Sequence, residues 1–261
     1  NGCNKPKLID KEKSIKYIYN KYKIKDYLLM VGINYKYKNL HSVIEAYSNI
    51  IRRVNNKLVI VGNCNNSYGK KLIKLVKKLR LNKDVIFLGY VNDYDLEKLY
   101  QAAKIFIYPS LYEGFGLPIL EASANDTMVI TSQYSSIPEI GQGISIMINT
   151  NNLTEIQNSL LYWINNTEKF FIDKKKLKKF NWNLTVKKIY EIMCLLYEIK
   201  DMYNEIALIV TMYLFFNYIY MYYEVIINLI VIFIVCIEFI GMDCLISAFY
   251  LFYYSLYNIK I

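Results

Sequence analysis

The stretch YPSLYEGFGLPILEASA, residues 108–124, holds the side chains of this sequence that are best placed to do chemistry. Two of the ten glycines of the chain, Gly114 and Gly116, lie within three positions of each other. Glu113 and Glu121 stand on either side of them. The stretch therefore predicts a glycine-rich loop that leads into a helix, with a carboxylate at each end.

The loop and the start of its helix together predict an anion-binding site. Pro118 suits a first helical turn, where its missing N–H is not needed. Glycine lets the backbone approach a ligand, and the free amides around Gly116 and Leu117, with the helix dipole behind them, suit a diphosphate. Glu121, expected in the first helical turn, and Glu113 border this cradle and can accept hydrogen bonds from ligand hydroxyls. A molecule with hydroxyls on both sides of a diphosphate is a nucleotide sugar.

Short apolar runs alternate with helical patterns up to about residue 150. Each run ends near a Gly, Pro or Ser, as expected of parallel strands that are buried on both faces. The predicted strands are 27–32, 57–62, 84–89, 104–110 and 128–132, and the predicted helices between them are 39–54, 69–80, 94–103 and 118–124. This alternation predicts an α/β fold with a doubly wound parallel sheet, in which ligands bind beyond the carboxyl ends of the strands.

Beyond residue 150 the sequence becomes helical. The segment 152–166 begins with a capping box formed by Asn152 and Glu155, and 184–199 predicts another helix. We therefore assign residues 1–200 to one domain and 201–261 to a separate apolar tail.

The tail contains only three charged residues between positions 206 and 259. Because a bilayer span needs about 20 apolar residues, the tail predicts a transmembrane helical hairpin. Lysines precede it, which places the domain on the cytoplasmic face of a membrane. A buried hydrophobic layer and an out-of-frame read-through of AT-rich sequence remain alternatives. The uncharged stretches are 206–223, 225–237 and 244–259.

The composition argues against several classes of function. The net charge is +10, and the excess lies in residues 1–200, which suits phosphates or an acidic membrane surface. An AT-rich coding bias explains the same lysines, and no nucleic-acid-binding motif accompanies them. Five scattered cysteines without a CxxC pair and a single histidine, His41, predict no metal site and fit a reducing compartment.

Several segments resemble one known family. EGFGLPILE, residues 113–121, resembles the E-x7-E motif of the retaining GT-B glycosyltransferases of family four, also called group 1 glycosyl transferases. The bacterial mannosyltransferase-like subgroup is the most similar. The other matching segments are NGCN (1–4), which resembles NGVD, VGINYKYKNL (31–40), which resembles VGxxxxRKNL, FNWNLTVKKIYEIM (180–193), which resembles FSWExTAxxxxxxY, and the stretches 85–110 and 129–140.

The resemblance implies that the chain holds the C-terminal, donor-binding Rossmann-like half of a GT-B fold, and that an N-terminal acceptor-binding domain is missing. It assigns Glu113 a catalytic role at the hydroxyls of the transferred sugar. Glu121 is implied to bind the ribose, and Lys38 the diphosphate. The other implied donor-binding residues are Gly32, Tyr90 and Val91, the last two beside the base, and the amides of Phe115, Gly116 and Leu117.

The implied reaction transfers a hexose, such as mannose, from a GDP- or UDP-linked sugar to a glycan or lipid-linked acceptor with retention of configuration. It relies on positioning and charge stabilisation, so neither a cofactor nor a metal is expected. Without its N-terminal half the chain is expected to be inactive. The alternatives are a non-catalytic nucleotide-sugar-binding module or degenerate remnant, and, from the tail alone, a membrane-tethered interaction protein.

Two departures from the family pattern concern the site. Ile33 stands where the family usually has an arginine. The segment after the motif, ACGTPV in the family, reads ANDTMV, so Asp126 replaces a glycine and Met128 a proline. An acidic side chain so close in sequence to the cradle is expected to weaken diphosphate binding.

Overall fold

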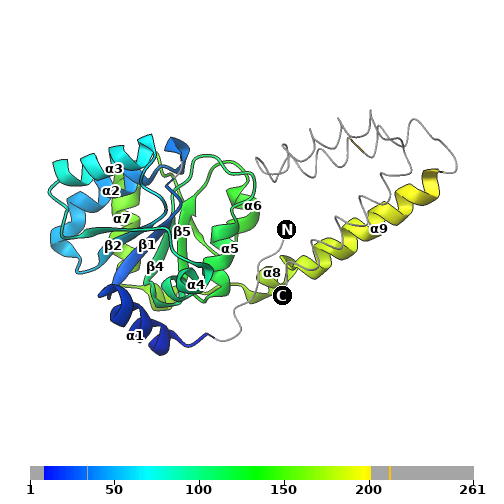
Figure 1. Cartoon of the computed structure of the whole chain (residues 1–261), viewed down its shortest axis with the longest axis horizontal. Helices are drawn as coiled ribbons and strands as arrows, with labels where there is room; N and C mark the ends of the chain where they lie inside the picture. Colours follow the sequence, from blue (N-terminus) through cyan, green and yellow to red (C-terminus); the bar gives the residue numbers. More distant parts are fainter. Residues whose placement is uncertain (1–8, 34, 201–211, 213–261) are drawn as a thin grey trace. The chain divides into compact units, whose positions relative to one another are not determined.

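A computed structural model describes residues 9–33, 35–200 and 212 of the chain. Within these residues, six parallel strands form one sheet in the order β3-β2-β1-β4-β5-β6 (Figure 1). This order confirms the predicted doubly wound sheet, because the strands wind outward in both directions from the central pair β1 and β4. The strands are β1 (Tyr27–Val31), β2 (Lys57–Val61), β3 (Val85–Gly89), β4 (Ile105–Tyr108), β5 (Met128–Ser132) and β6 (Ile146–Ile148).

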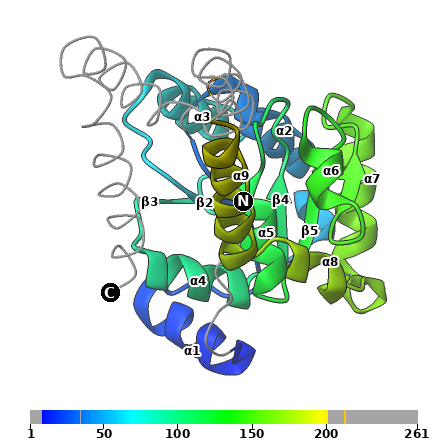
Figure 2. The same ribbon diagram turned by 90° about the vertical axis from the view of Figure 1, so that its right-hand side faces the viewer.

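Helices cover both faces of the sheet (Figures 1 and 2). Helices α2, α3 and α7 pack on one face, and α1, α4, α5 and α6 pack on the other. The helices are α1 (Lys11–Tyr22), α2 (Leu40–Ile50), α3 (Ser67–Lys78), α4 (Asp93–Ala102), α5 (Leu117–Ala124), α6 (Ile137–Gly141), α7 (Leu153–Ile164), α8 (Lys174–Lys179) and α9 (Trp182–Lys200), with short 3-10 turns η1 (Lys36–Lys38), η2 (Ile51–Arg53) and η3 (Thr167–Lys169).

The central strand shows why its sequence is apolar throughout. Successive side chains of a strand point to opposite faces of the sheet. Leu28 and Met30 of β1 pack under α2 and α3, whereas Tyr27 and Leu29 pack under α1 and α4. All four are at most 1% exposed, because helices cover both faces of the strand.

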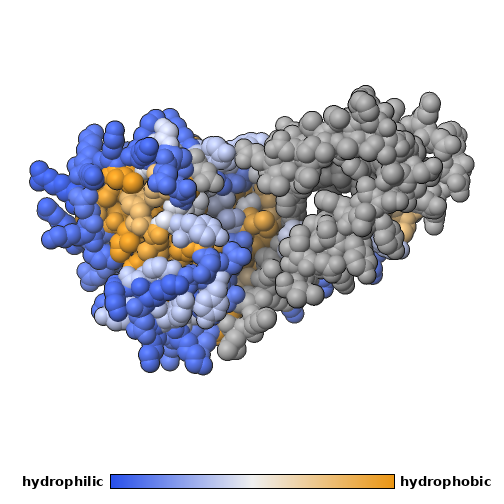
Figure 3. Space-filling view, in the orientation of Figure 1, coloured by the Kyte–Doolittle hydropathy of each residue, from blue (hydrophilic) through white to orange (hydrophobic). Residues whose placement is uncertain are grey.

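The edge strand β3 is less well covered. The side chains of Ile86, Phe87 and Leu88 are only half-buried, in contrast to those of β1. An apolar area is visible between the polar outer surfaces of α1 and of α2 and α3 (Figure 3). This edge lies two strands away from the point where the winding reverses.

The five predicted strands and the helices between them are confirmed, with ends that differ by a few residues. The predicted helix 39–54 is α2 followed by the separate turn η2. In the predicted capping box, Asn152 accepts a hydrogen bond from the Glu155 amide, but the Glu155 carboxylate accepts one from the amide of Asn149. Strand β6 and helices α1, α6 and α8 were not predicted.

A buried carboxylate fastens α1 to α4. Asp95 of α4 is 2% exposed and accepts hydrogen bonds from the Lys21 ammonium at 2.6 Å and from the hydroxyls of Tyr17 at 2.7 Å and Tyr22 at 2.8 Å. A buried charge is tolerated when donors surround it in this way. The unpredicted helix α1 is therefore an integral part of the sheet domain.

The predicted apolar tail lies outside the described residues, apart from position 212. In the described ranges, no helix is long and apolar enough to cross a membrane. The transmembrane hairpin, the domain boundary at residue 200 and the cytoplasmic membrane location therefore stay predictions.

Candidate functional site

Two loops meet where the winding of the sheet reverses. The loop after β1 carries Lys38, and the loop after β4 carries Glu113. The Lys38 Nζ atom lies 2.6 Å from Glu113 Oε1, and the two side chains are 17% and 12% exposed. The structure thus brings together two predicted site residues that are 75 positions apart in the sequence. Their partial burial keeps the attraction between the charges less screened than in an exposed pair.

The loop after β1 is fixed at two points, within its short turn η1 and directly after it. Asn39 follows the turn in a left-handed conformation (φ 56°), which asparagine tolerates better than most residues. Its side-chain amide donates a hydrogen bond to the Thr150 carbonyl at 2.9 Å. Within η1, the Tyr37 carbonyl accepts a hydrogen bond from the Leu111 amide at 2.8 Å. This bond joins the loop after β1 directly to the loop after β4.

The backbone of Glu113 is held from a third strand. The hydroxyls of Ser135 and Ser136, in the loop after β5, donate to the Glu113 carbonyl at 2.9 and 2.6 Å. The Glu113 amide in turn donates to the Ser135 hydroxyl at 3.3 Å. The carboxylate is therefore presented by a loop that is anchored on both sides.

The helix after this loop begins as predicted. Gly116 adopts a left-handed conformation (φ 97°) immediately before α5, and no side chain caps the helix. Since Pro118 has no N–H, the amides that lack an intrahelical partner at the start of the helix include those of Gly116 and Leu117. The glycine and the open helix start are the features that an anion cradle needs.

Glu121 is not in the first helical turn, so that prediction is wrong. Because α5 begins at Leu117, Glu121 is its fifth residue and lies one turn further from the helix start. Its Oε2 atom accepts a hydrogen bond from the hydroxyl of Tyr100 at 3.1 Å. Burial raises the pKa of this carboxyl above its ordinary value of 4.5, although the Tyr100 hydrogen bond opposes the shift.

The raised pKa of Glu121 gives a testable dependence of stability on pH. The folded protein holds the Glu121 proton more tightly than the unfolded chain, so protonation stabilises the fold. Raising the pH from 4.5 through the raised folded pKa removes this contribution. Between pH 4.5 and neutrality, the unmodified chain should therefore lose stability relative to Glu121→Gln as the pH rises, because the glutamine variant has no proton to release at this position. Denaturant unfolding of both proteins measures this, and parallel profiles would contradict it.

The remaining predicted donor residues lie on other parts of the same sheet edge. Gly32 follows β1 with φ 91° and has open space where a side chain would begin. Tyr90 and Val91 follow β3, three strand spacings from β4, or about 14 Å. Tyr90 is 83% exposed, whereas Val91 is 8% exposed and packs in the core. Only the Tyr90 side chain and the backbone of this segment are open to a ligand.

Phe115 is oriented by packing. Its ring makes an edge-on contact with the ring of Phe180, with centroids 5.9 Å apart. The half-buried side chain therefore faces protein, and the residue can serve a ligand through its backbone amide, as predicted.

Asp126 does not border the cradle. It lies after the C-terminal end of α5 and directly before β5, and therefore at the opposite edge of the sheet from the start of α5. Its carboxylate forms an ion pair with Lys174 at 2.9 Å. This position removes the reason for expecting Asp126 to weaken diphosphate binding. The positive φ of Asp126 (54°) explains why glycine suits this position. Ile33, at the place of the family's arginine, is fully buried.

Three residues of the site were not predicted: Tyr108, Ser135 and Ser136. Tyr108 ends β4 and lies beside the Lys38–Glu113 pair, with its hydroxyl 3.3 Å from the Lys38 Nζ atom. The only available signals were the polar ring at the end of an apolar run and the paired serines after the next strand. Neither signal shows which loop the side chain will contact.

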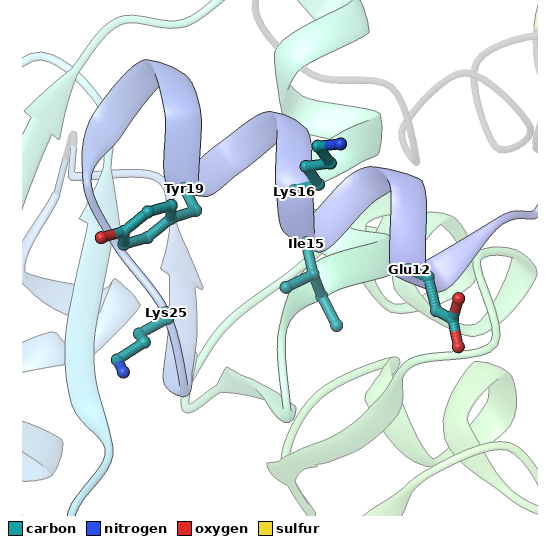
Figure 4. Close-up of a pocket in the computed structure, with 5 residues that line it drawn as sticks. All are labelled: Glu12, Ile15, Lys16, Tyr19 and Lys25. Carbon is teal, nitrogen blue, oxygen red and sulfur yellow. The ribbon is translucent and has the colours of Figure 1, made fainter.

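A shallow pocket lies on α1, apart from the Lys38–Glu113 pair and the start of α5. Figure 4 shows Glu12, Ile15 and Tyr19 projecting from α1, with Lys25 from the loop that follows it. Its lining includes none of the predicted site residues. Across residues 9–33 and 35–200, no cluster of three or more His, Cys, Asp or Glu side chains is arranged to hold a metal ion.

The fold and the site define an α/β protein with a lysine–glutamate pair and an uncapped helix start at the switch point of its sheet. Residues 11–181 match the family described as Glycosyl transferases group 1. The chain therefore belongs to the group 1 glycosyl transferases, as the sequence motifs indicated.

The chain is also similar in sequence to a curated glycosyltransferase. The chain is 32% identical over 136 residues to O-antigen chain mannosyltransferase B of Escherichia coli, a match that covers 52% of this chain and 36% of that protein. The chain therefore spans well under two thirds of the length of this relative.

Solved structures share the fold. The chain superposes on Anabaena HepE in complex with UDP-glucose with a TM-score of 0.63 at 18% identity, covering 70% of this chain and 52% of that one. It also superposes on the C-terminal domain of a group 1 glycosyl transferase from Francisella tularensis with a TM-score of 0.54 at 24% identity, covering 66% of this chain and 91% of that domain. These likenesses agree with the sheet order and helix layers described above.

Proposed function

We propose that this chain is the donor-binding half of a retaining hexosyltransferase that takes its sugar, such as mannose, from a GDP- or UDP-linked donor. The observation that carries the proposal is the Lys38–Glu113 pair, which joins two loops at the switch point next to the open start of α5. Ligands of doubly wound sheets bind at this point. The acceptor in this proposal is a glycan or a lipid-linked sugar.

In this proposal each group has a separate task. The Lys38 ammonium and the amides of Gly116 and Leu117 bind the diphosphate and stabilise its charge as it leaves. Glu113 accepts hydrogen bonds from hydroxyls of the transferred sugar, and Glu121 binds the ribose. The departing diphosphate takes the proton of the acceptor hydroxyl, so no protein nucleophile or metal is needed.

Transfer also requires the acceptor to be held against the donor. The curated relative and HepE are each much longer than the segment that matches this chain. We therefore expect this chain alone to bind the donor nucleotide without transferring the sugar, because catalysis between two bound substrates depends on positioning both of them.

Calorimetric titration of the chain with UDP and with GDP tests the proposal. We expect binding of one or both nucleotides, with the same affinity in the presence of EDTA and of Mg²⁺, because Lys38 and backbone amides supply the phosphate contacts. Affinity for neither nucleotide would overturn the proposed function, and affinity that depends on Mg²⁺ would overturn the metal-free part of it. AMP serves as a control that carries phosphate without a diphosphate.

A further inference from the structure

Tyr108 occupies the centre of the site, although its ring belongs to the core. It is the last residue of β4 and is 2% exposed. Its ring stacks on that of Phe106 with centroids 5.9 Å apart, and its carbonyl accepts a hydrogen bond from the Thr131 hydroxyl at 2.9 Å. Strand pairing and packing therefore fix the direction of the ring.

The hydroxyl of Tyr108 contacts the ion pair through Lys38. The Lys38 Nζ atom donates to it at 3.3 Å, and the ammonium also lies 5.4 Å from the ring centroid. Burial, followed by the charge of Glu113, raises the pKa of Tyr108, so the hydroxyl keeps its proton.

These contacts leave hydrogen-bonding capacity on both charged groups. An ammonium has three N–H donors, and an ionised carboxylate has about four acceptor sites. In the described part of the chain, the ammonium donates to Glu113 and to Tyr108, which leaves one donor for a ligand. The Glu113 carboxylate likewise retains acceptor sites beyond the one used by Lys38.

We propose that Tyr108 is a positioning residue, whose buried hydroxyl holds Lys38, and through Lys38 also Glu113, in the arrangement that receives the diphosphate and the transferred sugar. The proposal rests on the proposed function for the identity of the ligand. The geometry on which it depends is present without any ligand. A phenylalanine at this position would fill the same space in the core and lack only the hydroxyl.

The first test measures how strongly the Tyr108 hydroxyl restrains the Lys38 ammonium, through the reactivity of that amine. Brief acetylation of the whole chain with acetic anhydride, followed by peptide mass spectrometry, gives the modification rate of Lys38 relative to that of exposed Lys36. Tyr108→Phe should raise this ratio by about fivefold, because the ammonium loses one of its two hydrogen bonds. Tyr27→Phe is the matched control, since it also removes a buried hydroxyl, one bonded to the Leu99 carbonyl at 2.7 Å.

The second test measures the consequence for binding. Tyr108→Phe should raise the Kd for UDP or GDP by about fivefold in the unmodified chain. In a Lys38→Ala background it should have no further effect, because UDP lacks the sugar that Glu113 would contact. Such non-additivity is expected if Tyr108 acts through Lys38, whereas a general loss of stability would act in both backgrounds.

The outcomes separate this proposal from the proposed function. An unchanged acetylation ratio in Tyr108→Phe, or equal losses of affinity in both backgrounds, would overturn the role of Tyr108. If the unmodified chain binds neither nucleotide, the proposed function fails, and the acetylation ratio still decides whether Tyr108 holds Lys38. Circular dichroism of each variant establishes that it is folded before either test.

Discussion

Lys38→Ala is expected to weaken the binding of UDP or GDP to the chain by about 1–3 kcal/mol, which corresponds to roughly 5- to 150-fold in Kd. The variant loses the charged contact to the diphosphate. It also leaves the Glu113 carboxylate, 12% exposed, facing the phosphates without its counter-ion. Calorimetry under the conditions used for the unmodified chain measures the difference.

Lys36→Ala provides the control for Lys38→Ala. Lys36 belongs to the same turn η1 and carries the same charge, but its side chain is exposed. Its removal should change the affinity by less than about threefold, because exposed charges are largely screened. Equal losses in the two variants would show that net charge alone attracts the nucleotide, and would remove Lys38 from the site.

Gly116→Ala is expected to damage both the fold and the site. At φ 97° an L-residue is strained, and the added Cβ atom would lie 3.2 Å from the Cδ1 atom of Ile119. We expect the free energy of unfolding to fall by about 1–3 kcal/mol. Nucleotide affinity should also fall by at least about tenfold, because the backbone at the start of α5 can no longer keep its conformation.

Gly143→Ala separates these two effects. Gly143 also has a positive φ (81°), but the added Cβ atom would make only an ordinary contact, 3.6 Å from Asp173 Cβ. It lies after α6, outside the loops that carry Lys38 and Glu113. Gly143→Ala should lower the stability and leave the affinity unchanged. If both variants lose affinity in proportion to stability, the start of α5 has no special role in binding.

The strands and most helices could be predicted because their periodicity is local. Parallel strands covered by helices are near-continuous apolar runs. Strands β1 to β5 are all such runs, although the edge strand β3 is only half-buried. Strand β6 has three residues and α6 has five, so neither is long enough to show a period. Asp10 caps the start of helix α1, which is a local signal. The stability of the helix depends on the contact of Lys21 with Asp95, 74 positions further along the chain, which no local pattern shows.

The site residues could be predicted individually, but not their contacts. The motif and the rule for doubly wound sheets place Lys38 and Glu113 at one edge. That they form an ion pair depends on the adjacency of β1 and β4, which only the strand order establishes. The contact of Tyr108 with Lys38 depends on the same adjacency, and those of Ser135 and Ser136 with Glu113 depend on the pairing of β4 with β5. The error over Glu121 arose from its distance along α5, since one turn separates it from the helix start.

The position of the nucleotide site tests the central claim most directly. Amide NMR spectra of the chain, recorded during titration with the nucleotide that binds more tightly, report which backbone groups respond. We expect the largest shifts at Lys38, Glu113 and residues 115–117, with smaller changes near Tyr90. Shifts confined to the exposed lysine run at 70–78 would contradict the account, because they would place the phosphates on a general basic surface instead of at the switch point.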